Sequence, residues 1–321
     1  MLNRREFFRK SAIGAAALTV PSLLGNDVKA HGFVNPVFEP LPLSILSFSF
    51  FRLVRERTMN MFGYFESCRF RYGLGAADLW NGMFESLDDD YINLVHTALK
   101  ERQLVIPNIA ADHASLIGRP SQDSPEDRAR RRALQDKYLR ISKKLGVGFL
   151  RFDAGPMRER GVTSDTDPWS DADFDYLVKR YREIAQYAYD HGFKAGAENH
   201  GGNAKYWPNM ERLIKAVDHP GFGICNHFGG WVGTPEENVA IDKLAAKHVC
   251  HTHIPWSISE SPLLQVHMNI LRDVGYKGFY STELHIRQNE YNLVGVQLSR
   301  VKAVLTSWNA GGTGHFIPPR N

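Results

Sequence analysis

The sequence predicts a single-domain α/β protein, a (β/α)8 TIM barrel in which eight parallel strands close into a ring surrounded by helices. Strand-like runs recur eight times over about 280 residues, capped helical stretches separate them, and no G-x-G-x-x-G stretch follows the first run. An open doubly wound sheet more often has about five to seven strands and uses such a glycine motif to hold a dinucleotide. No internal linker or low-complexity tract divides the chain, so one domain is expected.

Eight runs have the length and apolar content of buried strands. In chain order they are LPLSILSFSF (41–50), GAADLW (75–80), QLVIPNIAAD (103–112), GFLRFDAG (148–155), FKAGAENH (193–200), GFGICNHF (221–228), HVCHTHI (248–254) and GFYSTELH (278–285). Because helical stretches alternate with them at regular spacing, parallel pairing through helical crossovers is predicted.

Two of the helical stretches have clear ends. The first begins with Ser124 in the cap position and Pro125 in the first helical position, followed by Asp127, and it ends at Gly146. The second ends at Gly192 and is amphipathic. Its apolar face consists of Phe174, Leu177, Tyr181, Ile184 and Ala188.

Residues 1–30 are predicted to be an export signal rather than part of the barrel. The adjacent Arg4 and Arg5 precede a short apolar run, and the small-residue pattern at 28–30 suits cleavage before His31. Paired arginines in this position resemble the signal of the twin-arginine translocation machinery, so a periplasmic or otherwise exported location is expected. The alternative is a disordered basic N-terminus with an apolar patch.

Composition limits the partners of the remaining domain, residues 31–321. Removal of residues 1–30 takes away five basic and two acidic residues, which lowers the formal net charge from +4 to +1. No basic face is therefore expected for nucleic acid, and no later apolar run reaches the roughly 20 residues of a membrane span. Cys68, Cys225 and Cys250 are too scattered for a disulfide framework and are predicted to be small core residues.

Four consecutive predicted strands carry a potential metal ligand at or near their carboxyl ends. These ligands are Glu198, His227, His253 and Glu283, at intervals of 29, 26 and 30 residues. In a barrel such side chains converge on one mouth. Two carboxylates and two imidazoles suit one divalent ion such as Mn²⁺, Zn²⁺ or Co²⁺, with Mg²⁺ a further candidate.

Three motifs make the chain resemble the xylose isomerase-like TIM barrels, the sugar-phosphate isomerase/epimerase family. They are GAENHGG (196–202), HTHI (251–254) and GYKGFYSTELH (275–285), within a resemblance that covers roughly residues 40–305. The family includes tagatose epimerases, inosose dehydratases and endonuclease IV. Endonuclease IV-like hydrolysis is disfavoured here, because it needs more ligands for several zinc ions and a basic DNA surface.

The resemblance implies a Glu, Asp, His, Glu set that binds one divalent metal, with the two glutamates also moving protons. Glu198, His253 and Glu283 match the first, third and fourth places. His227, in CNHFGGW, stands where the family has aspartate. An imidazole in that place lowers the negative charge of the site by one.

The implied chemistry is proton transfer at a carbon beside a carbonyl. The hydroxyl-bearing carbon loses its proton to give an enediolate whose charge the ion stabilises, so epimerisation or aldose-ketose isomerisation follows. A lyase or dehydratase acting on a keto-sugar and a noncatalytic sugar-binding barrel remain alternatives. Pro255 and Trp256 stand where the family often has a Lys-Asp pair, which favours an unphosphorylated sugar, keto-sugar or polyol. Trp80, Trp231 and Trp256 are either platforms for a sugar face or packing residues.

Further residues are predicted to contact the substrate. His200 and His251 each lie two residues from a predicted ligand, on the same face of the strand. His251 is equally suited to supporting a ligand from behind. His113 after the third strand and Arg151 on the fourth are expected to reach the same mouth, as is Trp256 after the seventh.

Overall fold

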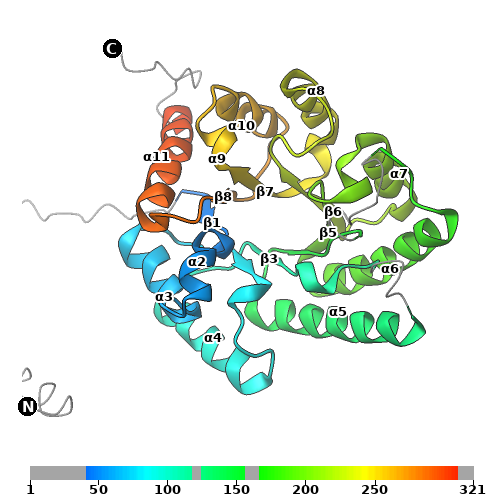
Figure 1. The fold of residues 1–321 in the computed structure, drawn as a ribbon, viewed down its shortest axis with the longest axis horizontal. Helices are drawn as coiled ribbons and strands as arrows, with labels where there is room; N and C mark the ends of the chain where they lie inside the picture. The colour runs from blue at the N-terminus through cyan, green and yellow to red at the C-terminus, as the bar shows by residue number, and fades with distance from the viewer. Residues whose placement is uncertain (1–40, 118–123, 156–165, 310–321) are drawn as a thin grey trace, which may run out of the picture. The chain divides into compact units, whose positions relative to one another are not determined.

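Eight parallel strands run side by side through the centre of the protein, in the order β1-β8-β7-β6-β5-β4-β3-β2 (Figure 1). The computed structural model describes residues 41–117, 124–155 and 166–309. The strands are β1 (Leu43–Ile45), β2 (Leu79–Trp80), β3 (Asn108–Ala110), β4 (Phe149–Arg151), β5 (Lys194–Glu198), β6 (Phe222–His227), β7 (Val249–Pro255) and β8 (Tyr280–Glu283). All seven pairings between neighbouring strands are parallel, as predicted.

The two ends of this sheet meet at a seam between β1 and β2. An isolated parallel bridge joins Leu46 to Asp78, and the backbone N–H of Asp78 donates to the carbonyl oxygen of Ile45 at 3.1 Å. The buried hydroxyl of Tyr64 bridges the seam, 2.6 Å from the carbonyl oxygen of Ile45 and 2.8 Å from that of Asp78. These bonds close the ring, so the predicted TIM barrel is confirmed.

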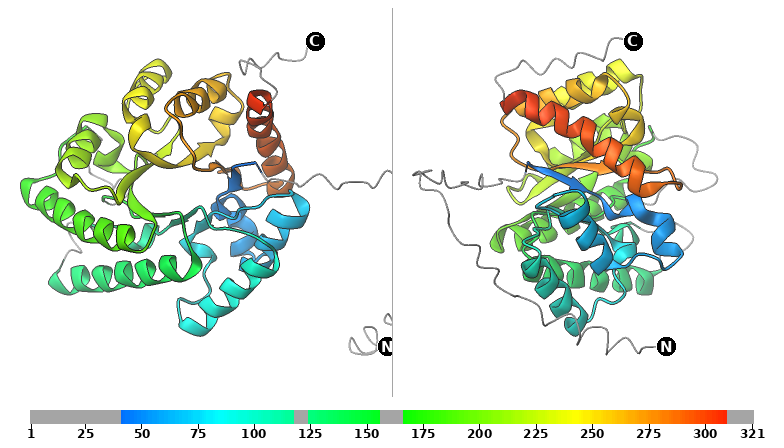
Figure 2. Two further views of the ribbon diagram at one scale, coloured as in Figure 1. Left: turned by 180° about the vertical axis from the view of Figure 1, so that it is seen from behind. Right: turned by 90° about the vertical axis from the view of Figure 1, so that its left-hand side faces the viewer.

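Helices form the outer layer of the barrel (Figures 1 and 2). Those described are α2 (Phe51–Arg55), α3 (Met61–Glu66), α4 (Asp89–Glu101), α5 (Pro125–Leu145), α6 (Asp171–Asp190), α7 (Trp207–Val217), α8 (Pro235–Ala245), α9 (Trp256–Ser259), α10 (Leu263–Asp273) and α11 (Glu290–Asn309).

Local sequence explains the ends of the predicted helices. In α5, Ser124 and Asp127 form a reciprocal capping box, which satisfies two N–H groups that a helix start leaves free. Gly146 then ends the helix with φ of 67°, a left-handed conformation that costs glycine little. Helix α6 buries the expected apolar face, and a large apolar side chain such as leucine or isoleucine contributes roughly 1.5–3 kcal/mol when fully buried. The buried residues of that face are Phe174, Leu177, Tyr181, Ile184 and Ala188.

Several strands are shorter than the predicted runs, because the chain turns as it leaves the barrel. Within the predicted run 41–50, β1 ends at Ile45 and residues Ser47–Phe50 form a 3-10 turn, since the N–H of Ser49 bonds to the carbonyl of Leu46 at 2.9 Å. The run 75–80 contributes only two residues to β2. The run 103–112 contributes three to β3, and a helical turn follows from Asp112.

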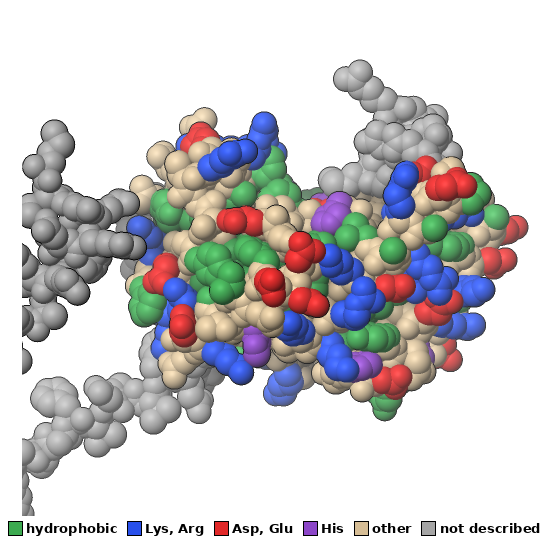
Figure 3. Space-filling model, turned by 90° about the horizontal axis from the view of Figure 1, so that it is seen from below, with side chains coloured by type: hydrophobic (Ala, Val, Ile, Leu, Met, Phe, Trp, Pro, Cys, Tyr) green, Lys and Arg blue, Asp and Glu red, His purple; other side chains and the backbone are tan. Residues whose placement is uncertain are grey.

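Basic and acidic side chains are interspersed on the face shown in Figure 3, and none of the described helices is long and apolar enough to cross a membrane. Cys68 and Cys225 are buried free thiols, as predicted for core residues, whereas Cys250 is only partly buried. The predicted export signal, residues 1–30, and the cleavage position before His31 lie outside the described residues.

Candidate active site

The four predicted ligands lie at or near the carboxyl ends of adjacent strands β5 to β8, and together we call them the mouth cluster: Glu198, His227, His253 and Glu283. Sheet register explains why they converge. Glu198 is opposite Cys225 and His253 is opposite Ser281, so the ligands on β6 and β8 stand two residues farther along. Because side chains repeat their direction every two residues, all four point to the same side of the sheet.

The donor atoms of the mouth cluster lie close together. Nδ1 of His253 is 2.7 Å from Oε1 of Glu198 and 3.9 Å from Oε2 of Glu283. Nδ1 of His227 is 3.4 Å from each of these two carboxylate oxygens. Glu198, His253 and Glu283 are at most 5% exposed. Two buried carboxylates therefore share a small space with two imidazoles.

Unsatisfied atoms show that these residues fit a divalent cation. Nδ1 of His227 and Oε2 of Glu283 are buried and have no hydrogen-bond partner among the described residues. Ligands held about 2.1 Å from one ion are separated from each other by about 3.0–3.4 Å, which matches the 3.4 Å spacings around His227. A carboxylate-imidazole set of this kind accepts Mn²⁺, Zn²⁺ or Co²⁺.

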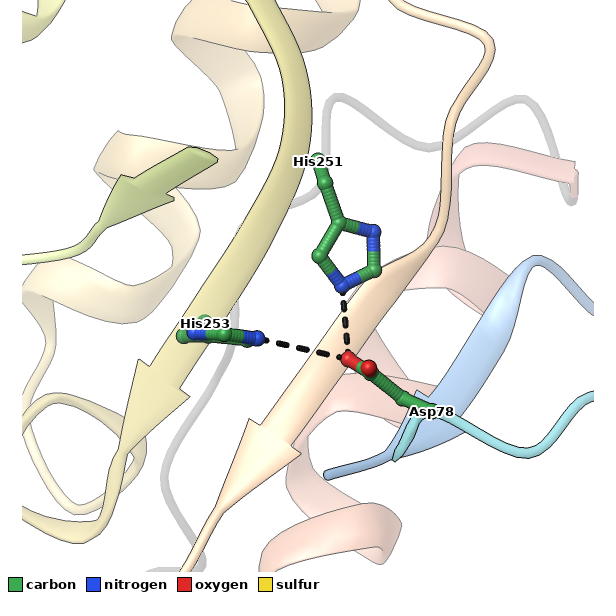
Figure 4. A group of neighbouring side chains, drawn as sticks. All are labelled: Asp78, His251 and His253. Atoms are coloured by element: carbon green, nitrogen blue, oxygen red, sulfur yellow. Dashed lines mark hydrogen bonds and ion pairs between the residues drawn. The ribbon is translucent and has the colours of Figure 1, made fainter. Parts of the chain in front are cut away.

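Asp78, at the seam of the barrel, contacts His253 of the mouth cluster and also His251 (Figure 4). Its Oδ2 lies 2.7 Å from Nε2 of His251 and 3.3 Å from Nε2 of His253, and it accepts a 2.7 Å hydrogen bond from Ser281. Burial opposes ionisation of Asp78, but the two histidines outweigh burial and hold its pKa below the ordinary value. With Nε2 of His253 turned toward Asp78, Nδ1 faces Glu198 and is the atom available to an ion.

A second group, formed by Asp78, His251 and His253, also has the spacing of a metal site. Both oxygens of Asp78 already accept hydrogen bonds, because Asn108 donates to Oδ1 at 2.9 Å and Ser281 to Oδ2. Unsatisfied ligand atoms lie instead in the mouth cluster, at Nδ1 of His227 and Oε2 of Glu283. The deeper group is therefore better described as a support for His253 than as an ion site, which agrees with the supporting role considered for His251.

Arg151, predicted to contact substrate, is 2% exposed and surrounded by carboxylates. Its Nη1 lies 2.7 Å from Oδ1 of Asp153 and 2.8 Å from Oε2 of Glu198, and its Nη2 pairs with Asp112. Burial opposes ionisation of Glu198, but Arg151 and then His253 outweigh it, so the pKa of Glu198 is well below its ordinary value. Arg151 therefore fixes one wall of the site.

The other predicted substrate contacts lie in different surroundings. The ring of His200 stacks 5.9 Å from that of His227, and its Nδ1 is 3.8 Å from Asp153. Burial lowers the pKa of His200, but the bond to Asp153 and nearby charges outweigh it and raise the pKa to about 9. His113 is exposed and its Nε2 lies 3.3 Å from the hydroxyl of Tyr138.

The three tryptophans proposed as sugar platforms differ in their burial and contacts. Trp256 begins α9 and packs against the hydrophobic core, and its contact with substrate stays a prediction. Trp231 is only 3% exposed and donates to Asp242 at 2.8 Å, which fits packing rather than a sugar platform. Trp80 is partly exposed, lies edge-on to Phe48 at 5.2 Å and donates to Asp112 at 2.8 Å.

Sequence reasoning missed several residues of the site. Asp112 and Asp153 follow the carboxyl ends of β3 and β4 by two residues, whereas Asp78 comes directly before β2. A search for polar residues at both ends of all eight strands would have found them. His285 was also missed, although it follows Glu283 by two residues. Its Nε2 is 3.0 Å from Oε1 of Glu283. Burial opposes ionisation of Glu283, but His285 and the neighbouring histidines lower its pKa to about 2.

The sequence matches the family described as xylose isomerase-like TIM barrel over residues 70–296, whereas a comparison with curated proteins found no match. Among solved structures, D-allulose 3-epimerase from Methylomonas sp. is 13% identical, with a TM-score of 0.63 over 82% of this chain and 97% of that chain. For 3-keto-D-glucoside 4-epimerase YcjR from E. coli the identity is 17% and the TM-score 0.61, over 76% of this chain and 94% of that chain. The probable 3-DHS dehydratase AsbF from Bacillus anthracis is 15% identical, with a TM-score of 0.55 over 81% of this chain and 98% of that chain. Identities this low show only a shared fold, but the family match covers more than half of the sequence, so the chain belongs to the xylose isomerase-like TIM barrel family.

Proposed function

We propose that this protein is a divalent-metal-dependent isomerase or epimerase that acts on an unphosphorylated sugar or keto-sugar through an enediolate. The observation that carries the proposal is the pair of buried carboxylates, Glu198 and Glu283, each 3.4 Å from the unsatisfied Nδ1 of His227. A sugar-modifying enzyme is also what the epimerases and the probable dehydratase among similar structures suggest.

The proposed ligands are the mouth cluster, and a bound ion would stabilise negative charge on substrate oxygens. The two glutamates then differ in their surroundings. Oε2 of Glu198 is held by Arg151 at 2.8 Å, which fixes this carboxylate in place. Oε1 of Glu283 faces His285, whose side chain is 50% exposed, so Glu283 lies toward the open side.

Both glutamates start as carboxylates, because their pKa values are lowered. A carboxylate is the form that can take a proton from the carbon next to a carbonyl, and the C–H electron pair then becomes the double bond of the enediolate. Return of a proton to the other face of that carbon gives the epimer. Return to the neighbouring carbon gives the isomer.

The unphosphorylated substrate is inferred from Pro255 and Trp256, which stand where the family often has a Lys-Asp pair. An apolar side wall supports the same inference. Phe48 and Trp80 are partly exposed and in edge contact, and Phe48 also lies 5.3 Å from His285. Aromatic faces of this kind pack against the C–H face of a sugar ring.

Elimination is the second candidate reaction, because loss of a β-substituent from the same enediolate needs no further residue. The structural likeness to the probable 3-DHS dehydratase is the observation that favours elimination as a second candidate. A dehydratase would release water and lower the product mass by about 18 Da, whereas an isomerase or epimerase would leave the mass unchanged.

We further propose that the protein is exported by the twin-arginine pathway, on the basis of Arg4 and Arg5 and the small-residue pattern before His31. That pathway transports folded proteins. A barrel that must keep a metal ion would benefit from folding before transport.

The test is carbon-bound hydrogen exchange. The metal-loaded protein, beginning at His31, would be incubated in D2O with a panel of sugars, keto-sugars and polyols, and NMR would follow deuterium at carbon. We expect exchange with at least one substrate and its loss in Glu283→Gln. The matched control is Glu260→Gln, which removes a carboxylate that pairs with Arg300 at the surface.

Two outcomes would contradict the proposal. If sugars bind but no carbon exchanges hydrogen and no product forms, the protein is a noncatalytic binding barrel. If exchange withstands complete removal of metal by strong chelators, the metal-dependent mechanism is wrong.

A further inference from the structure

One nitrogen of Arg151 lies within a group that has the spacing of a second metal site. Asp153, Glu198 and His200 offer ligand atoms that all lie within 4.8 Å of one another. Nη1 of Arg151 contacts all three residues, at 2.7 Å from Oδ1 of Asp153, 2.8 Å from Oε2 of Glu198 and 3.3 Å from Nδ1 of His200. The guanidinium therefore occupies the place that the group would offer to a cation.

Glu198 has the arrangement of a carboxylate that bridges two cations. Its Oε1 faces His227 and His253 in the mouth cluster, and its Oε2 faces Arg151. Bridging carboxylates of this kind hold two metal ions about 3.5–4 Å apart in enzymes that hydrolyse phosphate esters and peptides. In this chain the second position is filled by a side chain that stays charged at every physiological pH.

The guanidinium is also anchored so that it cannot easily leave. Its Nη2 pairs with Oδ1 of Asp112, while Oδ2 of Asp112 accepts a 2.8 Å hydrogen bond from Trp80. The backbone N–H of Asp112 donates to the side chain of Asn81 at 2.9 Å. Arg151 is 2% exposed, so withdrawal would leave three carboxylates, two of them deeply buried, without a counter-charge.

We propose that Arg151 acts as a built-in second cation that keeps the centre mononuclear, so that its removal creates a site for a second divalent ion between Asp153, Glu198 and His200. The inference rests on the proposed function, because it takes the mouth cluster as the first metal site. It also restricts the chemistry. With only one exchangeable ion, the centre suits proton transfer in a chelated sugar rather than two-metal hydrolysis.

The experiment counts ions per chain. Wild type, Arg151→Gln and the double variant Arg151→Gln/Asp153→Asn would be stripped of metal, loaded with excess Zn²⁺ or, separately, Mn²⁺, desalted and analysed for metal and protein. We expect about one ion in the wild type, two in Arg151→Gln and one in the double variant. Calorimetric titration with the same ions should show a second binding event only in Arg151→Gln.

The number of ions that Arg151→Gln binds in excess of wild type tests this inference. The number of ions that wild type binds tests the proposed metal site. A folded Arg151→Gln that gains no ion, or a wild type that already holds a second ion at Asp153, overturns the inference. If Arg151→Gln folds only when metal is added, two bound ions support the inference, and failure to fold at any metal concentration counts against it. A wild type without metal, combined with one ion in Arg151→Gln, refutes the proposed function alone.

Discussion

Replacement of Asp78 by asparagine tests whether its carboxylate sets the ring of His253 for metal binding. Oδ2 of Asp78 lies 2.7 Å from Nε2 of His251 and 3.3 Å from Nε2 of His253. It also accepts a 2.7 Å hydrogen bond from Ser281, and Oδ1 accepts one from Asn108. An asparagine has the same shape but only one accepting oxygen and no charge. Loss of such an outer carboxylate weakens metal binding about 10- to 100-fold, or roughly 1.4–2.7 kcal/mol.

The measurement is the dissociation constant for Zn²⁺ by competition with a chromophoric chelator, with circular dichroism as the check on folding. Ser281→Ala is the matched control, because it removes a single neutral donor to the same oxygen. That loss should lower stability by about 0.5–1.5 kcal/mol and change metal affinity less than about threefold. If folded Asp78→Asn also binds Zn²⁺ within about threefold of wild type, Asp78 does not position His253.

Three other predictions concern the metal, the pH dependence and export. His227→Ala should weaken metal binding more than His227→Asp, because aspartate is the family's usual ligand at this position. His227→Asp should also shift the metal selectivity toward Mg²⁺ or Mn²⁺. If both variants bind metal within about twofold of wild type, His227 is not a ligand. The pKa of His200 is raised to about 9 in the folded protein, compared with about 6.5 for a histidine in an unfolded chain. Protonated His200 therefore stabilises the metal-free fold fully below about pH 6.5, and this contribution is lost as the pH rises through 9. The thermal unfolding temperature of protein stripped of metal by a chelator should therefore decrease between pH 6.5 and 9, and it should decrease less in His200→Gln. Equal decreases in the two proteins would contradict this assignment. Replacing Arg4 and Arg5 with lysine should leave precursor in the cytoplasm on cell fractionation, and unchanged export would show that another signal is used.

The sequence predicted the barrel and the mouth cluster because both follow from a repeated local pattern. Glu198, His227, His253 and Glu283 each stand at or near the end of a strand-like run, and a closed parallel ring brings such positions together. The contacts between strands did not follow from this pattern. Asp78 and His251 are 173 residues apart, and neither the spacing nor the composition of the chain shows that they meet.

Arg151 shows the same limit in another way. Its place on the fourth strand predicted a side chain at the mouth, where a cation often binds substrate. The structure instead surrounds it with Asp112, Asp153 and Glu198, from three different parts of the chain. Which partner an arginine takes depends on side-chain packing across the ring, and periodicity carries no information about that packing.

The seam has a consequence for the order of assembly during synthesis. Asp78 closes the ring through the carbonyl of Ile45, and its side chain needs His251 and Ser281, which lie near the other end of the chain. Nascent chains that have not yet reached the last strand therefore lack Ser281, and those that have not reached β7 lack His251 as well. The four residues of the mouth cluster can come together only after translation has passed residue 283, so any metal ion that this cluster binds would be loaded late in synthesis or after it.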